Sequence, residues 1–345
     1  MKEAKRANAP IKRQRANQGK TALKVIVAGG VGVFALLLLF NAGMRQLAVR
    51  DDSQVPNAVR ARSSFDGQRA FADLERICAL GPRPPGSPEA AQLRALIHAE
   101  LEACGVPSKE YPFDAKTPLG PKKMVNVVGY VEGTEDGIII LGNHYDTKYF
   151  PEFRFVGAND GGSTTAWMIE MARALGPRRE GRSVWLVWFD GEEAFQEWTE
   201  SDSLYGSRQF VRDLRTQGKL NSVEAMINVD MIGDKYLGII RDSGAPAWLS
   251  NLIWSTAAGL GYSGHFLAQS SVIQDDHMPF RLAGIAAINL IDFEYGGSRL
   301  DHSNLWHTPN DTIEHVSADS LQVVGDVLYH ALPDLDLVLN ERAPN

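Results

Sequence analysis

Acidic and imidazole side chains recur in this sequence directly after apolar runs. His144 and Asp146 follow IIILGN, the stretch Asp190–Glu193 follows SVWLVWF, and Asp230 follows AMINV. Imidazole nitrogen and carboxylate oxygen are zinc ligands, and a catalytic zinc site usually takes three protein ligands and keeps one position open. In α/β sheets, active sites form where strands end. The spacing therefore suggests a metal-dependent site at one edge of a sheet.

Two further segments add polar groups to this set. Asp160 lies in GANDGG at the predicted start of a helix, and His307 follows Trp306 near the C-terminus. Alone, each has an ordinary interpretation, because Asp often caps a helix and a loop histidine is common. The adjacent Glu192 and Glu193 can divide two tasks, one binding metal and the other exchanging a proton with substrate. The combination favours a zinc enzyme over unrelated loop residues.

Alternating apolar segments must position these groups. Continuous apolar runs indicate strands buried on both faces, and amphipathic segments lie between them. This alternation predicts a three-layer α/β/α sandwich around a mixed, mostly parallel sheet. The expected strands are Met124–Val131, Gly137–Gly142, Ser183–Phe189, Ala225–Val229, Tyr236–Ile240 and Ile285–Ile291, and the expected helices span 66–78, 87–103, 162–175, 203–215, 246–259 and 316–331. The first two strands are expected to be neighbours joined by a turn at 133–136.

The N-terminal region has a different composition. Residues 1–24 carry eight Lys or Arg and one acid, and residues 25–44 (VIVAGGVGVFALLLLFNAGM) carry no charge. About 20 apolar residues can span a bilayer, and the basic flank orients the N-terminus to the cytoplasm. We expect a basic cytoplasmic tail (1–24), a transmembrane signal anchor (25–44), a linker (45–62) and one extracytoplasmic catalytic domain (63–340). A cleaved signal peptide is the alternative.

Bulk composition excludes some classes of protein. The formal net charge is −7, which gives no support for nucleic-acid binding. The chain has two cysteines, Cys78 and Cys104, too few for a disulfide framework or a CxxC metal site. They are expected in helical segments, where burial is favoured slightly over pairing. The composition is therefore compatible with a globular enzyme and with a globular binding domain.

The order of the polar groups resembles the zinc aminopeptidase clan, which follows the pattern HxD…D…EE…D…H. The surrounding strings resemble more closely one branch, the animal-type glutaminyl-peptide cyclotransferases (glutaminyl cyclases). The similar strings span the expected catalytic domain. They are HYDTKYF (144–150), FVGAND (155–160), FDGEEAFQEW (189–198), DSLYGSR (202–208), VIQDDHMPF (272–280) and WHT (306–308).

The resemblance implies a role for each matching residue. It implies one zinc bound by Asp160, Glu193 and His307, with Glu192 as the general acid/base. It places Asp230 and Asp275 in an acid network beside Glu192. The substrate pocket would be lined by Trp198, Trp306, Ile273 and Gln274. The implied reaction converts the N-terminal glutamine of a peptide or protein to pyroglutamate and releases ammonia.

The sequence departs from this family in three places. Asn289 stands where the animal enzymes carry a histidine on a late strand. Residues 292–304 replace a shorter loop before Trp306. A cysteine pair of the family is absent, with Asn143 and Thr165 at those positions. These differences affect the expected proton network, the pocket rim and the covalent support of the site.

A zinc aminopeptidase and a non-catalytic binding domain are the two alternative functions. A zinc aminopeptidase would use His144 and Asp230, together with Asp160, for a second metal, and Glu192 to activate a water. Asp146 would belong to that second site or to a hydrogen-bond network. A non-catalytic binding domain on the same fold would be expected to lose ligands, and none is lost here. The strings around Trp198 and Asp275 favour the cyclase.

Overall fold

The structure is a computed structural model that describes residues 63–296 and 304–342. The predicted tail, transmembrane anchor and linker (1–24, 25–44 and 45–62) lie outside the described residues. Among the helices that are described, none has the length and apolar character needed to cross a membrane. The described residues belong to the predicted catalytic domain (63–340) and to two residues after it.

A mixed sheet forms the centre of this domain. Its strands are β1 (Ser108–Thr117), β2 (Gly120–His144), β3 (Arg178–Phe189), β4 (Val223–Asp230) and β7 (Ala286–Ile291). β1 pairs with β2 in antiparallel sense, whereas β4 runs parallel to both β2 and β7. The sequence prediction of an α/β protein with a mixed sheet is therefore confirmed.

β2 is one long strand whose two halves both pair with β3. In the first half, Val127 lies opposite Trp188 and Val131 opposite Val184, so the two chains run in opposite directions. In the second half, Ile138 lies opposite Ser183 and His144 opposite Phe189, so they run in the same direction. β3 therefore lies between the two halves of β2.

This arrangement corrects two sequence predictions. The segments 124–131 and 137–142 are not neighbours, because the apolar β3 offers hydrogen-bonding groups along both edges and takes a place between them. The strand predicted at Tyr236–Ile240 begins only at Ile239. It forms β5 (Ile239–Asp242), which pairs with β6 (Phe266–Ser271) in a separate small sheet. Hydrophobic runs indicate strands but do not specify their partners.

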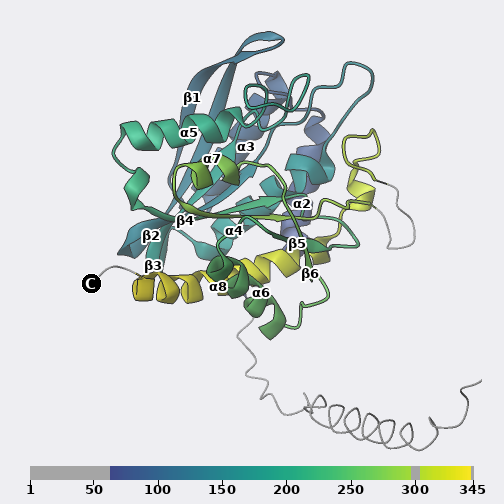
Figure 1. Cartoon of the computed structure of the whole chain (residues 1–345). Helices are drawn as coiled ribbons and strands as arrows, with labels where there is room; N and C mark the ends of the chain where they lie inside the picture. The colour runs from purple at the N-terminus through teal and green to yellow at the C-terminus, as the bar shows by residue number, and fades with distance from the viewer. Residues whose placement is uncertain (1–62, 297–303, 343–345) are drawn as a thin grey trace, which may run out of the picture. The chain divides into compact units, whose positions relative to one another are not determined.

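Alternate residues of the central strands point into two apolar clusters. In β3, Val184, Leu186 and Trp188 face one cluster, and Trp185 and Val187 face the other. Helices α5 (Tyr205–Thr216) and α7 (His277–Leu282) cover the second face (Figure 1). The first face packs against α2 (Gly67–Leu80), α3 (Pro88–Ala103), α4 (Thr164–Leu175), α6 (Ala247–Gly259) and α8 (Ala318–Arg342). The domain therefore has three layers, with helices on both faces of the sheet, and this explains why its central strands are continuously apolar.

Three elements had no prediction: β1, β6 and α7. β1 has the sequence SKEYPFDAKT, in which charged residues and Pro112 interrupt the apolar pattern. Such a composition suits a strand at the edge of a sheet, where one side of the backbone needs no partner.

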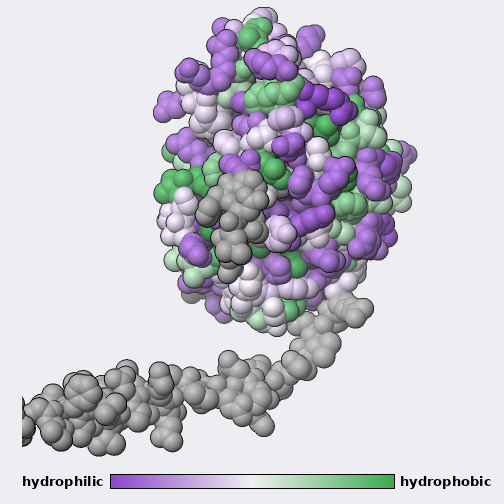
Figure 2. Space-filling model, turned by 90° about the vertical axis from the view of Figure 1, so that its right-hand side faces the viewer, coloured by the Kyte–Doolittle hydropathy of each residue, from purple (hydrophilic) through white to green (hydrophobic). Residues whose placement is uncertain are grey.

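On the face in Figure 2, hydrophobic residues are scattered among hydrophilic ones, as is normal for a surface in contact with water.

We predict that truncating the centre of the sheet destabilises the domain strongly. Leu141 is fully buried on the second half of β2, so Leu141→Ala removes contacts and leaves a cavity. The free energy of unfolding should fall by about 2–5 kcal/mol in urea titrations. Leu282→Ala, at a side chain that is 82% exposed, is the matched control. It should change that free energy by less than about 0.5 kcal/mol, and an equal effect of both would contradict the assigned core.

Candidate active site

The site forms where several parallel strands end at one edge of the sheet. β2 ends at His144, β3 at Phe189 and β4 at Asp230, and their register places these ends side by side. The loop after β3 carries Glu192 and Glu193. The pairing of these strands thus brings together side chains that are far apart in the chain, as expected from the sequence.

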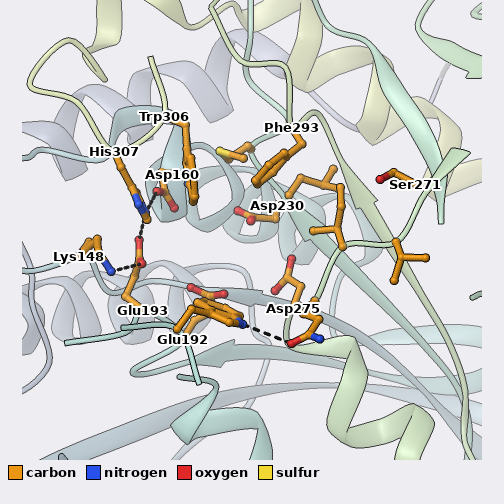
Figure 3. Close-up of a pocket in the computed structure, with 16 residues that line it drawn as sticks. Lys148, Asp160, Glu192, Glu193, Asp230, Ser271, Asp275, Phe293, Trp306 and His307 are labelled. Carbon is orange, nitrogen blue, oxygen red and sulfur yellow. Dashed lines mark hydrogen bonds and ion pairs between the residues drawn. The ribbon is translucent and has the colours of Figure 1, made fainter. Parts of the chain in front are cut away.

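Asp160, Glu193 and His307 gather at one end of a pocket (Figure 3). Nε2 of His307 lies 3.0 Å from Oε1 of Glu193 and 3.3 Å from Oδ2 of Asp160. One potential ligand atom from each residue lies within 4.8 Å of the others. The geometry allows all three to reach a single ion.

The backbone around this trio is held in unusual conformations. His307 has a φ of 56°, a left-handed value that costs a non-glycine residue about 1–3 kcal/mol. Asp160 lies beside Gly161, whose φ is 75°. A Cβ on Gly161 would lie 2.7 Å from the backbone oxygen of Asp146, so a larger residue cannot fit there without movement. These conformations aim the side chains of His307 and Asp160 at the same point.

The electrostatics of the trio favour a bound cation. Burial alone would lower the pKa of His307, but Glu193 and Asp160 together raise that pKa to about 10. The same environment that stabilises a proton on His307 stabilises a metal ion bound to its neutral ring. One imidazole nitrogen and two carboxylates are a donor set typical of catalytic zinc. The residues present therefore fit zinc.

His144 lies behind the trio and is almost fully buried. Its Nε2 is 3.1 Å from Asp160 Oδ1 and 3.3 Å from Asp230 Oδ1, and its Nδ1 is 3.5 Å from Asp146 Oδ1. His144, Asp160 and Asp230 form a second group with metal-binding geometry. The carboxylate of Asp146 also accepts hydrogen bonds from the backbone N–H groups of Glu192 and Glu193, at 3.2 and 3.4 Å. His144 thus contacts Asp160 and Asp230, and Asp146 holds the backbone of the two glutamates.

A cluster of buried acids lies next to the trio. Burial raises the pKa of Glu192 well above its usual value, and Glu193 and Asp275 raise it further. Burial likewise raises the pKa values of Asp230 and Asp275, and the two carboxyl groups are close enough that Asp230 adds to the shift of Asp275. A carboxyl group with a raised pKa can hold a proton near neutral pH and release it. Glu192 therefore has the properties of a general acid/base.

The pocket has a volume of about 660 Å³ and opens to solvent. Trp306 stacks on the ring of His307, with centroids 3.9 Å apart, and Phe293 packs against Trp306. Trp198 is 41% exposed at the opposite wall, and its indole N–H donates to Oε1 of Gln274 at 3.4 Å. Ten residues singled out from the sequence line this pocket: Asp160, Glu192, Glu193, Trp198, Asp230, Ile273, Gln274, Asp275, Trp306 and His307.

The sequence reasoning did not assign several residues that contribute to the site. Lys148 lines the pocket; its ammonium donates to the Ala194 carbonyl at 2.7 Å and lies 3.6 Å from Glu193. It stands in the string HYDTKYF, so the sequence places it close to His144 and Asp146 but does not show that it contacts Glu193. The remaining unassigned lining residues are Met231, Ser271, Val272, Ile291 and Phe293. Ser271 and Ile291 are the last residues of β6 and β7, and the other three lie in loops, so their place at the pocket depends on tertiary packing that residue spacing does not reveal.

Comparisons with known proteins identify the family of this fold. Residues 126–332 match peptidase family M28. The crystal structure of a glutaminyl cyclase from an Acidobacteriales bacterium superposes with a TM-score of 0.74 and 37% identity, covering 82% of this chain and 97% of that chain. Glutaminyl cyclase from Porphyromonas gingivalis gives 0.71 and 28%, covering 79% and 99%. The glutaminyl-peptide cyclotransferase of Bos taurus is 28% identical, over 71% of this chain and 76% of its own length.

The match over most of the sheet and of the polar loops shows that the chain belongs to peptidase family M28. Within M28, its 37% identity to a glutaminyl cyclase, over 97% of that enzyme's chain, groups it with the glutaminyl cyclase branch. The family resemblance noted in the sequence is therefore confirmed.

Two departures from the animal enzymes have structural counterparts here. Asn289 is buried, and its amide donates to Asp275 Oδ2 at 2.8 Å while its carbonyl oxygen accepts from Asn228 at 3.1 Å. Asn289 thus supplies a hydrogen bond to the acid network without a titratable group. Where the family has a cysteine pair, the Asn143 amide donates to Thr165 Oγ1 at 3.2 Å. Cys78 and Cys104 are both free and partly buried.

The two adjacent glutamates should respond differently to the same substitution. We predict that Glu193→Gln lowers zinc content, because an amide replaces the charged ligand that faces His307. Glu192→Gln should keep its zinc, because Glu192 lies outside the trio. Metal analysis of the two purified variants after identical dialysis measures the difference. Zinc loss from Glu192→Gln, with retention in Glu193→Gln, would mean that the roles are reversed.

Proposed function

We propose that the protein is a zinc-dependent glutaminyl-peptide cyclotransferase, which converts an N-terminal glutamine to pyroglutamate and releases ammonia. The observation that carries this proposal is the position of Glu192, a buried carboxyl group that lines the same pocket as the trio, Trp198 and Trp306. The proposal agrees with the similarity of this chain to the glutaminyl-peptide cyclotransferases of Bos taurus and Drosophila melanogaster.

The reaction needs proton transfer and a folded substrate. The α-nitrogen of the glutamine attacks its own γ-carbonyl carbon, so one C–N bond forms and the bond to the amide nitrogen breaks. Glu192 takes a proton from the α-ammonium and gives one to the departing nitrogen, which leaves as ammonia. Its raised pKa suits both transfers. Zinc bound by Asp160, Glu193 and His307 would supply Lewis-acid polarisation of the γ-carbonyl oxygen.

The remaining residues would bind and orient the substrate. Trp198 and Trp306 provide flat apolar walls that favour the compact ring-forming conformer over an extended one. Asp230 and Asp275 line the pocket with carboxyl oxygens that can accept hydrogen bonds from an α-ammonium group. Asn289 would hold the carboxyl of Asp275 in one orientation through its amide. An intramolecular reaction requires no activated water, so the walls can exclude it.

A metalloaminopeptidase is the second candidate. The observation in its favour is the group His144, Asp160 and Asp230, which has the geometry to hold a second ion next to the first. With two ions, Glu192 would activate a water for attack on a peptide bond. The same assay separates the two candidates, because cyclisation and cleavage give different products.

We predict that the purified protein cyclises a Gln-initiated peptide and does not cleave a leucine anilide. Mass spectrometry should show loss of one ammonia from the peptide, and a chelator should suppress that loss. Glu192→Gln should lower kcat by about 10²–10⁴-fold, because it removes the proton carrier. Release of aniline product without cyclisation would refute the proposal and favour the aminopeptidase.

We also propose that residues 25–44 anchor the protein, with its N-terminus in the cytoplasm and residues 63–340 outside it. The support is the uncharged run of 20 residues after eight basic ones. The full-length protein should sediment with membranes and resist alkaline carbonate extraction. A variant that begins at residue 63 should be recovered in the supernatant. Recovery of the full-length protein in the supernatant, or of a shortened mature form, would exclude a retained anchor.

A further inference from the structure

Tyr295 lies in the segment after β7, where the sequence departs from the family it resembles. Its side chain is fully buried and packs with Met231, Ile291 and Leu305. The backbone N–H of Leu305 donates to the Tyr295 carbonyl at 3.0 Å. The Tyr295 hydroxyl donates to Oδ1 of Asp311 at 2.8 Å. The segment after β7 is thus hydrogen-bonded to a buried carboxylate.

Asp311 is in turn bonded to the backbone at the predicted metal ligand Asp160. Its side chain is only 1% exposed. Oδ1 accepts from the backbone N–H of Asn159 at 2.8 Å, and Oδ2 accepts from that of Asp160 at 3.1 Å. Asp160 has a ψ of 101°, outside the helical range, although it stands in a helical run. The Asp311 carboxylate therefore accepts from two consecutive backbone N–H groups at the point where this helical run is kinked.

Asp311 links two ligand-bearing segments, through its carboxylate on one side and its backbone on the other. The backbone N–H of Asp311 donates to the carbonyl of Thr308 at 3.2 Å, one residue after His307. On the other side, Asn159 accepts from the Gly233 N–H at 2.8 Å, which ties its segment to the loop after β4. Rotation of the Asp311 side chain would disturb the Asp160 backbone without breaking the contacts of the surrounding apolar residues.

We propose that Tyr295 is a positioning residue for the metal site: through Asp311 it fixes the backbone of Asp160 and thereby sets the affinity for zinc. Three donors hold the two oxygens of Asp311, and the Tyr295 hydroxyl is the one side-chain donor among them. Without it, the carboxylate keeps its two backbone partners but loses the contact that fixes its plane. The inference depends on the metal role of Asp160 put forward above, and it is tested through metal binding rather than cyclisation.

The test compares Tyr295→Phe with Tyr262→Phe. Both substitutions keep the ring and remove one hydroxyl–carboxylate hydrogen bond, of 2.8 Å to Asp311 and 2.7 Å to Asp326 respectively. Tyr262 lies outside the pocket lining. Zinc dissociation constants are measured by competition with a chelator of known affinity. Tyr295→Phe should bind zinc about tenfold more weakly than the wild type, as is usual for loss of a group that orients a ligand, and Tyr262→Phe should bind it unchanged.

Two further measurements separate positioning from a general structural effect. Metal-free Tyr295→Phe should unfold at the same temperature as metal-free Tyr262→Phe, and excess zinc should restore its kcat. A lower unfolding temperature with an unchanged zinc dissociation constant would overturn the proposal. If the wild-type protein binds no zinc, the metal site itself fails, which is a different outcome from equal affinities in wild type and variant.

Discussion

The concentration of buried carboxylates at one edge of the sheet is the constraint on which the rest of the site depends. Asp146, Asp160, Glu192, Glu193 and Asp230 are each less than a tenth exposed. Charges placed side by side without water are tolerated only when cations, hydrogen bonds or protons compensate them. His144, His307 and several backbone N–H groups supply part of that compensation. A divalent ion and protonation of Glu192 are the remaining means, and both are what the proposed chemistry uses.

Sequence reasoning was successful where one local rule decides the outcome. The carboxyl ends of parallel strands meet at one edge, so residues that follow IIILGN, SVWLVWF and AMINV were expected together, and His144, Glu193 and Asp230 are together. Pairing of strands was less predictable. The two halves of β2 are adjacent in sequence but separated by β3, because the choice of partner depends on the whole sheet and not on the turn between the halves.

The supporting residues of the site were the least predictable part. The Asp311 carboxylate accepts from the backbone of Asp160, 151 residues away in the chain, and from the hydroxyl of Tyr295, 16 residues away. Neither Asp311 nor Tyr295 has a type or spacing that distinguishes it from an ordinary loop acid or a core tyrosine. Lys148 was inside a recognised string, yet only its contacts with Ala194 and Glu193 in the folded structure indicate what it does. Residue type predicts which groups can bind or react, whereas orientation of those groups is a property of tertiary packing.

The hydrogen bond between Asn143 and Thr165 has a consequence for where the protein can fold. It joins the end of β2 to helix α4 at the place where related enzymes carry cysteines, and the only two thiols of this chain are free. Disulfides form only under oxidising conditions and are lost under reducing ones. A side-chain amide donating to a hydroxyl is insensitive to that balance. The region around the site can therefore reach its folded state whether the compartment is oxidising or reducing.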